Sequence, residues 1–476
     1  MKFCVAYCRI FYLVCIVLLL CSCLKHAGLY KGPDPGVLKE PLYIYPFSRE
    51  TNGVTAEITI QTRENVDLEQ LKVEIPPLKY NKSWLFTLTQ DDCKHAAYCY
   101  TWAAINGRPL TEKYYYDVRH YLYNDLPPDV YYLGKTLGST DGAGNEVRFN
   151  FTTTLAPEWN FMNAECGVSF GGATNNYRFY MKSGLIWDDV VDMVNYGTGI
   201  AFHDVNTTNV ENVDSIVLHY TCSQDSILKY LAGRGCKMLA EPNGNKTYVM
   251  AAQRYTPIQL MTAQAQTVKL FPFKVENDLQ GQLINRMFSD IDYTKKFIES
   301  QLQLKQEERE AVCVGVHGTG TDWIEFFLWL NDNYGKDGED SMWFTSLEEY
   351  YEYNYYRIHG RIEKEILNKN SFKLKIDLPA GEYFYYPSVT LNIEGLAKTD
   401  ILAVSVDDAV KGLSWGEYGE GTMVNINCSK WLLEHATHFV EQYEKNPTDI
   451  TRRDAHYFVA MLKESPQKEA LLKRIN

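Results

Sequence analysis

The sequence predicts an α/β protein with a largely parallel sheet, joined to a β-sandwich-like part and followed by C-terminal helices. Three observations carry this prediction. Between residues 84 and 356, apolar strand-like runs alternate with helical stretches, which favours a parallel sheet or barrel with ligands at the carboxyl ends of its strands. Residues 371–427 contain short strand-like runs about a dozen residues apart, a spacing typical of a sandwich. Residues 431–444 and 453–464 have amphipathic helical patterns.

Length and composition limit the possible partners. A chain of 476 residues is too long for one small core and suggests two or three domains. The formal net charge of −13 disfavours nucleic acid as a partner, because phosphate backbones are bound by basic surfaces. The 35 tyrosines favour a carbohydrate-binding surface, since aromatic rings stack on sugars and the phenol hydroxyl can form hydrogen bonds.

The first residues have the pattern of a targeting segment. Lys2 and Arg9 precede the apolar run 10–20, which is too short for a comfortable membrane span. The run ends in Leu20-Cys21-Ser22-Cys23, which resembles the signal of a bacterial lipoprotein, with Cys23 as the lipidated residue. This resemblance implies a protein of a Gram-negative bacterium, attached by lipid to a membrane of the cell envelope on its periplasmic or outer surface. A transmembrane anchor is the alternative.

The patterns divide the chain into successive parts. The expected order is a signal peptide (1–22), a Gly- and Pro-containing tether (23–40), an N-terminal β segment (41–80), the α/β part (81–360), a β-sandwich-like domain (367–428) and C-terminal helices (429–476). Both β-rich parts show period-two alternation, so we expect them to pack together as one sandwich flanking the α/β part.

Within the α/β part, apolar runs rich in β-branched residues predict strands, and apolar residues at helical spacing predict helices. The predicted strands are residues 84–89, 199–202, 237–239, 247–251 and 311–316. The predicted helices are residues 96–105, 187–195, 225–231, 280–305 and 321–333.

Polar residues follow several of these strand-like runs. Asp91 and Asp92 end the first run, His203 and His317 end two others, and Glu241 follows a third. Because carboxyl ends of parallel strands meet at one edge, these side chains are candidates for a common site. Each also has a structural interpretation: an Asp pair often caps a helix, and a single histidine is more often structural than catalytic.

These residues resemble the motifs of the NodB-type polysaccharide deacetylases, carbohydrate esterase family four, which have a distorted (β/α) barrel. Thr89-Gln90-Asp91-Asp92 matches the first motif of that family, which implies that Asp91 is the general base and Asp92 a metal ligand. The stretch from Trp187 to His203 resembles the lead-in to the second motif and makes His203 the first metal histidine. The second metal histidine would fall at Thr207, a departure, because a threonine hydroxyl is a poor zinc ligand.

Two further motifs complete the resemblance. Ala240-Glu-Pro-Asn-Gly244 is similar to the third motif without its arginine, and places Glu241 and Asn243 at the site. Val314-Gly-Val-His317 matches the motif that carries the general acid, His317. His95 follows the first motif closely and is a candidate replacement ligand, although its position in a helix favours a direction away from the site.

The resemblance implies metal-dependent hydrolysis of N- or O-acetyl groups on a polysaccharide or oligosaccharide. Asp91 and His317 would be catalytic, and Asp92 and His203 would bind a divalent metal, expected to be zinc. Thr207, together with Glu241, Asn243 and His95, would line the site. Two alternatives remain: a glycan-binding lipoprotein with impaired catalysis on the same scaffold, and a sugar hydrolase that uses Asp91 and Glu241 as its carboxylate pair.

Overall fold

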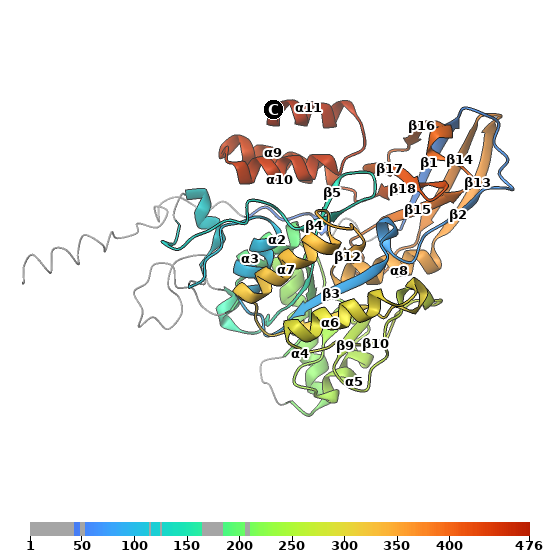
Figure 1. Cartoon of the computed structure of the whole chain (residues 1–476). Helices are drawn as coiled ribbons and strands as arrows, with labels where there is room; N and C mark the ends of the chain where they lie inside the picture. The colour runs from blue at the N-terminus through green and yellow to red at the C-terminus, as the bar shows by residue number, and fades with distance from the viewer. Residues whose placement is uncertain (1–41, 48–52, 114–115, 124–125, 164–183, 205–209) are drawn as a thin grey trace, which may run out of the picture.

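The computed structural model describes residues 42–47, 53–113, 116–123, 126–163, 184–204 and 210–476. The predicted signal and tether, with Cys23, and the candidate site residue Thr207 lie outside these described residues. The chain is a mixed α/β protein with parallel strands, helices, two four-stranded antiparallel sheets and an antiparallel pair formed by β4 (Gly138–Thr140) and β5 (Glu146–Arg148). Further helices follow at the C-terminal end (Figure 1).

Parallel strands form the centre of the α/β part. One sheet has the order β11-β3-β6-β7, with β12 (Met342–Phe344) also paired to β3, and a second has the order β10-β9-β8. The strands are β3 (Trp84–Gln90), β6 (Thr152–Thr154), β7 (Gly199–Ala201), β8 (Met238–Ala240), β9 (Leu260–Ala263), β10 (Leu283–Asn285) and β11 (Val312–Val316). Isolated parallel bridges join Phe202 to Leu239 and Met287 to Val314. The pairings therefore follow a closed order in which β7 meets β8 and β10 meets β11.

Helices alternate with these strands. They are α2 (Ala103–Ile105), preceded by a π-helical turn (Ala97–Trp102), then α3 (Trp187–Asn195), α4 (Val213–Tyr230), α5 (Lys246–Arg254), α6 (Ile291–Leu302), α7 (Thr321–Tyr334) and α8 (Leu347–His359). The helix predicted at 280–305 is wrong in its first part, because β10 precedes α6 there.

The strand predicted at residues 247–251 is also wrong, because this segment lies in α5. The Asn245 side chain accepts a hydrogen bond from the Thr247 N–H at 3.0 Å and caps the helix. The helix buries Tyr248 and Ala252 on one face and exposes Met250 on the other. The N-cap at Asn245 and the apolar face of the helix therefore outweigh the β propensity of residues 247–251.

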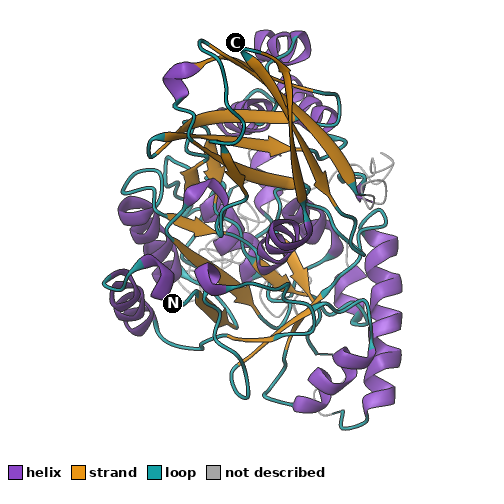
Figure 2. Ribbon diagram, turned by 90° about the vertical axis from the view of Figure 1, so that its right-hand side faces the viewer, coloured by secondary structure: helices purple, strands orange, loops and turns teal. Residues whose placement is uncertain are grey.

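The N-terminal segment and the later β-rich segment share two antiparallel sheets (Figure 1), and their long strands lie in the upper part of Figure 2. The first has the order β13-β14-β1-β16 and the second β17-β18-β15-β2. Their strands are β1 (Val54–Thr62), β2 (Lys72–Glu74), β13 (Arg361–Asn368), β14 (Ser371–Leu378), β15 (Ser388–Glu394), β16 (Ile401–Val406), β17 (Gly412–Tyr418) and β18 (Gly421–Asn427). Ile58 and Ile376 of the first sheet share one apolar core with Leu391 and Ile426 of the second. The two segments therefore pack together, as their alternation predicts.

Three C-terminal helices, α9 (Leu432–Lys445), α10 (Asp449–Ala460) and α11 (Pro466–Ile475), pack around a small apolar core of their own. Asp454 of α10 joins them to the α/β part, because its carboxylate accepts hydrogen bonds from Arg108 at 2.5 Å and Arg148 at 2.7 Å. Among the residues that the structure describes, no helix combines the length and the apolar character needed to cross a membrane.

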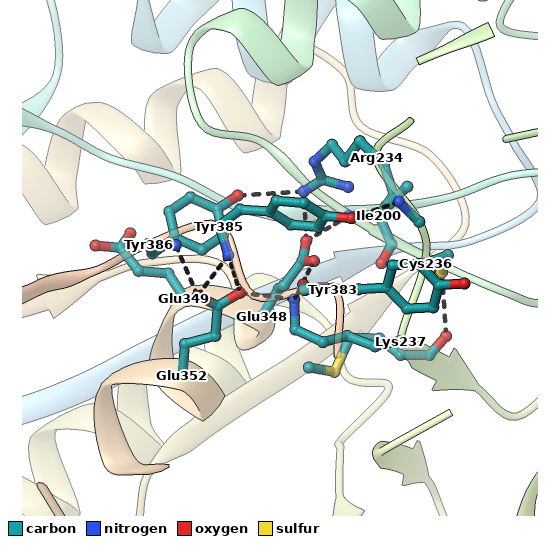
Figure 3. A network of polar contacts seen from close by, with 12 residues as sticks. Ile200, Arg234, Cys236, Lys237, Glu348, Glu349, Glu352, Tyr383, Tyr385 and Tyr386 are labelled. Atoms are coloured by element: carbon teal, nitrogen blue, oxygen red, sulfur yellow. Dashed lines mark hydrogen bonds and ion pairs between the residues drawn. The ribbon is translucent and has the colours of Figure 1, made fainter. Parts of the chain in front are cut away.

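A fully buried network of charges lies at the amino end of β8 (Figure 3). Lys237, the residue before β8, donates hydrogen bonds to Glu348 at 2.6 Å and to Glu352 at 2.7 Å, both on α8. Arg234 donates to the second oxygen of Glu348 at 2.5 Å. The backbone N–H groups of Tyr385 and Tyr386 donate to Glu352. The network thus joins the α/β part to the segment that leads into β15.

The network predicts a pH dependence of stability. Burial, aided by the neighbouring charge of Glu348, raises the pKa of Glu352 from 4.5 to about 7. The folded state therefore holds this proton more tightly than the unfolded state, so the stabilisation is complete below about pH 4.5 and is lost as the pH rises through about 7. We expect the difference in free energy of unfolding between the native chain and Glu352→Gln to decrease over this range, as measured by urea denaturation. Glu363→Gln, on an exposed strand, is the control; a pH-independent difference for Glu352→Gln would contradict the prediction.

Candidate metal centre and catalytic site

Strand β3 carries two carboxylates to the carboxyl edge of the parallel strands. All of its residues are buried, and Asp91, directly after it, is only 1% exposed. The Asp91 N–H donates to the Val316 carbonyl at 2.8 Å, and Arg286 donates to its Oδ1 at 2.7 Å. Asp92 and Cys93 then adopt left-handed backbone angles, with φ of 62° and 50°. This turn ends the alternation of the strand, so the two adjacent carboxylates can face one site.

His203 follows β7 and faces these carboxylates. Its Nδ1 lies 2.7 Å from the Ala240 carbonyl, which can only accept, so Nδ1 carries the proton and Nε2 of the neutral ring keeps its lone pair. Nε2 lies 3.5 Å from Asp92 Oδ1 and 3.8 Å from Asp91 Oδ2. The ring is therefore oriented by the backbone of β8 with its Nε2 toward the two carboxylates.

Asp204 adds a third donor beside His203. One donor atom each from Asp92, His203 and Asp204 lie within 4.8 Å of one another. Asp204 Oδ1 is buried and has no hydrogen-bond partner among the described residues. Two carboxylates and an imidazole are ligands that divalent metals accept, so these residues fit a metal ion.

The electrostatics of this group are coupled. When His203 is protonated, its Nε2–H can donate toward Asp92, and this interaction lowers the pKa of Asp92 to about 2. Burial opposes a charge on His203, but Asp91 and Asp92 outweigh this effect and raise its pKa. Burial raises the pKa of Asp204. The site therefore favours a positive charge between its carboxylates, whether a proton or a cation.

His317 follows β11 and is exposed. Its ring centroid lies 5.1 Å from that of Phe288, and its charge contributes, after the His203 hydrogen bond, to the lowered pKa of Asp92. An exposed imidazole near a carboxylate can exchange a proton with a bound molecule.

A pocket of about 400 Å³ opens beside the metal-ligand candidates. Asp92, His203 and Asp204 line it together with Trp159 and Phe161. A second cavity, of about 220 Å³, has a different lining that includes Tyr45, Tyr386, Asn425 and Tyr457. Among the described residues, no candidate site residue lines that second cavity, whereas Asp92 and His203 line the first pocket.

A family model described as "Putative polysaccharide deacetylase" matches residues 56–476. The chain belongs to this polysaccharide deacetylase family. No curated protein sequence matches the chain. The match extends beyond residues 84–356, which carry the motif resemblance, and includes most of β1, the remaining sandwich strands and the C-terminal helices. Both flanking parts are therefore features of this deacetylase family, and its description points to hydrolysis of acetyl groups on polysaccharide.

Other residues that the sequence placed at the deacetylase site have different surroundings. Glu241 is buried, and its carboxylate lies 2.6 Å from Lys246 Nζ. Asn243 is exposed in a left-handed turn, with φ of 53°. His95 is fully buried, and its Nε2 lies 3.7 Å from Asp189 Oδ2 of α3 rather than among the candidate metal ligands. The structure thus brings together Asp91, Asp92 and His203 and directs His95 elsewhere.

Two residues that no motif indicated, Arg286 and Asp204, lie beside the candidate site residues. Arg286 is buried after β10 and joins Asp91 to the Glu241 carbonyl, to which its Nη2 donates at 2.9 Å. It thus places a buried cation beside Asp91. The sequence pattern that could have identified Arg286 is an arginine directly after the strand-like run Leu-Ile-Asn. The helix predicted at residues 280–305 included this run, so the strand was not recognised. For Asp204, the signal was a carboxylate adjacent to the candidate ligand His203.

Proposed function

We propose that this protein is a metal-dependent deacetylase that hydrolyses N- or O-acetyl groups of a polysaccharide or oligosaccharide. The observation that carries the proposal is the position of buried, Arg286-bound Asp91 beside the donor group of Asp92, His203 and Asp204. The group lies at the carboxyl ends of parallel strands, where barrels of this kind hold their active sites. The closed order of strand pairing supports a distorted (β/α) barrel as the scaffold.

The residues divide the chemistry among them. Asp91, oriented by Arg286, accepts the proton of the attacking water, and His317 protonates the leaving amine or sugar oxygen. Asp92 and His203, with Asp204 beside them, would hold a divalent metal, for which zinc is the expected ion. Such a metal, when bound, polarises the acetyl carbonyl and lowers the pKa of bound water.

The pocket suits a sugar substrate. Trp159 and Phe161 give it aromatic walls, and sugar rings stack on aromatic faces. A sugar hydrolase using Asp91 and Glu241 is disfavoured, because each of these carboxylates is already engaged in an ion pair, Asp91 with Arg286 at 2.7 Å and Glu241 with Lys246 at 2.6 Å. We further propose attachment to the cell envelope through lipid on Cys23, which rests on the basic residues, short apolar run and Cys-Ser-Cys pattern of the first residues.

The direct test measures acetate release from acetylated glycans. The protein is first treated with a chelator to remove metal, and release is measured before and after a divalent metal is added. We expect added metal to restore release, and His203→Ala to lose both bound metal and activity because it removes the imidazole ligand. His359→Ala, which removes an exposed histidine paired with Asp278, is the matched control and should retain both. Sugar binding without metal-dependent acetate release on any substrate would instead support a glycan-binding protein.

A further inference from the structure

The motif does not identify the third metal ligand, because this chain has a threonine, Thr207, at the position of the second histidine of the family motif. His203 and Asp204 are adjacent, and adjacent residues of a strand point to opposite faces. However, β7 ends at Ala201, so this restriction does not apply to them. The donor atoms of both residues in fact lie within 4.8 Å of each other and of an Asp92 oxygen.

Asp204 also has an oxygen available for a ligand. Its Oδ1 is buried and has no hydrogen-bond partner among the described residues, whereas a buried carboxylate oxygen ordinarily has one. Asp91, by contrast, is engaged by Arg286, which leaves it the role of base rather than ligand. Asp204 is thus the carboxylate beside His203 and Asp92 that lacks another described partner.

We propose that Asp204 is the third protein ligand, so that the site holds its metal with two carboxylates and one imidazole. The inference rests on the proposed metal-dependent function and identifies the ion class that this site prefers. With a neutral imidazole, the ligands carry two negative charges, which balance a divalent cation, whereas one carboxylate and two imidazoles would carry a single charge. Carboxylate oxygens suit Mn²⁺, and imidazole suits Zn²⁺. The site therefore favours Mn²⁺ over Zn²⁺ more than a site with two histidines would.

The test is titration of the metal-free full chain with Mn²⁺ and with Zn²⁺ by calorimetry, together with the electron paramagnetic resonance of bound Mn²⁺. Asp204→Asn is expected to weaken binding of both ions by about 10–100-fold or more, because loss of a supporting group alone has an effect of that size. Asp204→His is expected to raise the Zn²⁺-to-Mn²⁺ affinity ratio by about tenfold or more, since it adds an imidazole. Asp204→Glu keeps the carboxylate and should retain the native ratio.

Asp214→Asn is the matched control, because this aspartate lies on α4, is 88% exposed and forms a surface ion pair with Arg254 at 3.0 Å. Unchanged affinities and an unchanged ratio in Asp204→Asn and Asp204→His would overturn the proposal, as would the absence of metal binding by the native chain. Because binding is measured without substrate, the proposed deacetylation can fail separately. If metal binding depends on Asp204 but no acetate is released, Asp204 is supported as a ligand and the proposed deacetylation is refuted.

Discussion

Asp91→Asn is expected to lower the kcat for acetate release by about 10²–10⁴-fold, the usual contribution of a general base. The substitution removes the proton-accepting oxygen but keeps the shape of the side chain and an oxygen for Arg286, which lies 2.7 Å away. The measurement is steady-state acetate release at saturating metal, accompanied by determination of bound metal.

Comparing Asp91→Asn with Asp92→Asn distinguishes the role of a general base, proposed for Asp91, from the role of a metal ligand, proposed for Asp92. Asp91→Asn should retain metal and lose turnover, whereas Asp92→Asn should lose metal, because Asp92 lies 3.5 Å from the ligating nitrogen of His203. Equal loss of metal in both variants would identify Asp91 as a ligand instead. A native rate in Asp91→Asn would assign proton transfer to another group.

Lys237→Met is expected to lower the free energy of unfolding by about 3–5 kcal/mol, because it leaves buried carboxylates without a cation. Lys237 is completely buried and bridges Glu348 and Glu352 at 2.6 and 2.7 Å. Arg234 neutralises part of the remaining charge on Glu348, but it does not contact Glu352 in the network of Figure 3. Urea denaturation at neutral pH measures the change.

The matched control is Lys375→Met. Lys375 forms an ion pair of 3.7 Å with Glu363, and the two side chains are 42% and 66% exposed. Exposed pairs contribute about 0–1 kcal/mol, so this variant should unfold nearly as the native chain does. A change below about 1 kcal/mol in Lys237→Met would mean that water or relaxation compensates the buried carboxylates.

The segments that could be predicted have strong local patterns. Strand β3 is rich in apolar and β-branched residues because it is buried on both faces. Helix α3 matches the predicted residues 187–195 because its apolar residues recur at helical spacing. The strands β6 and β9 have only three and four residues, too few for a period to be visible. Their positions depend on pairing with distant strands, which local sequence does not encode.

The site shows the same division. Asp91, Asp92 and His203 could be selected because each follows a recognisable strand and matches a motif. Arg286 could not, because its role depends on the register of β10, a strand formed by parallel pairing with β9. Asp204 was not selected because adjacent residues of a strand point to opposite faces, which would direct it away from the site if His203 faced it. This restriction ends where β7 ends, at Ala201.

The central position of β1 has a consequence for biosynthesis. Its two neighbours, β14 and β16, come near the end of the chain: Thr55 bonds to Asp377, 322 residues later. At a synthesis rate of about 5–20 residues per second, the ribosome needs roughly 15–65 s to supply these neighbours. During that interval β1 has two unpaired edges and an apolar face formed by Ile58 and Ile60. Lys373 and Asp377, which later bond to Glu57 and Thr55, are also absent until then, so the alternating polar side chains of β1 must limit its premature self-association.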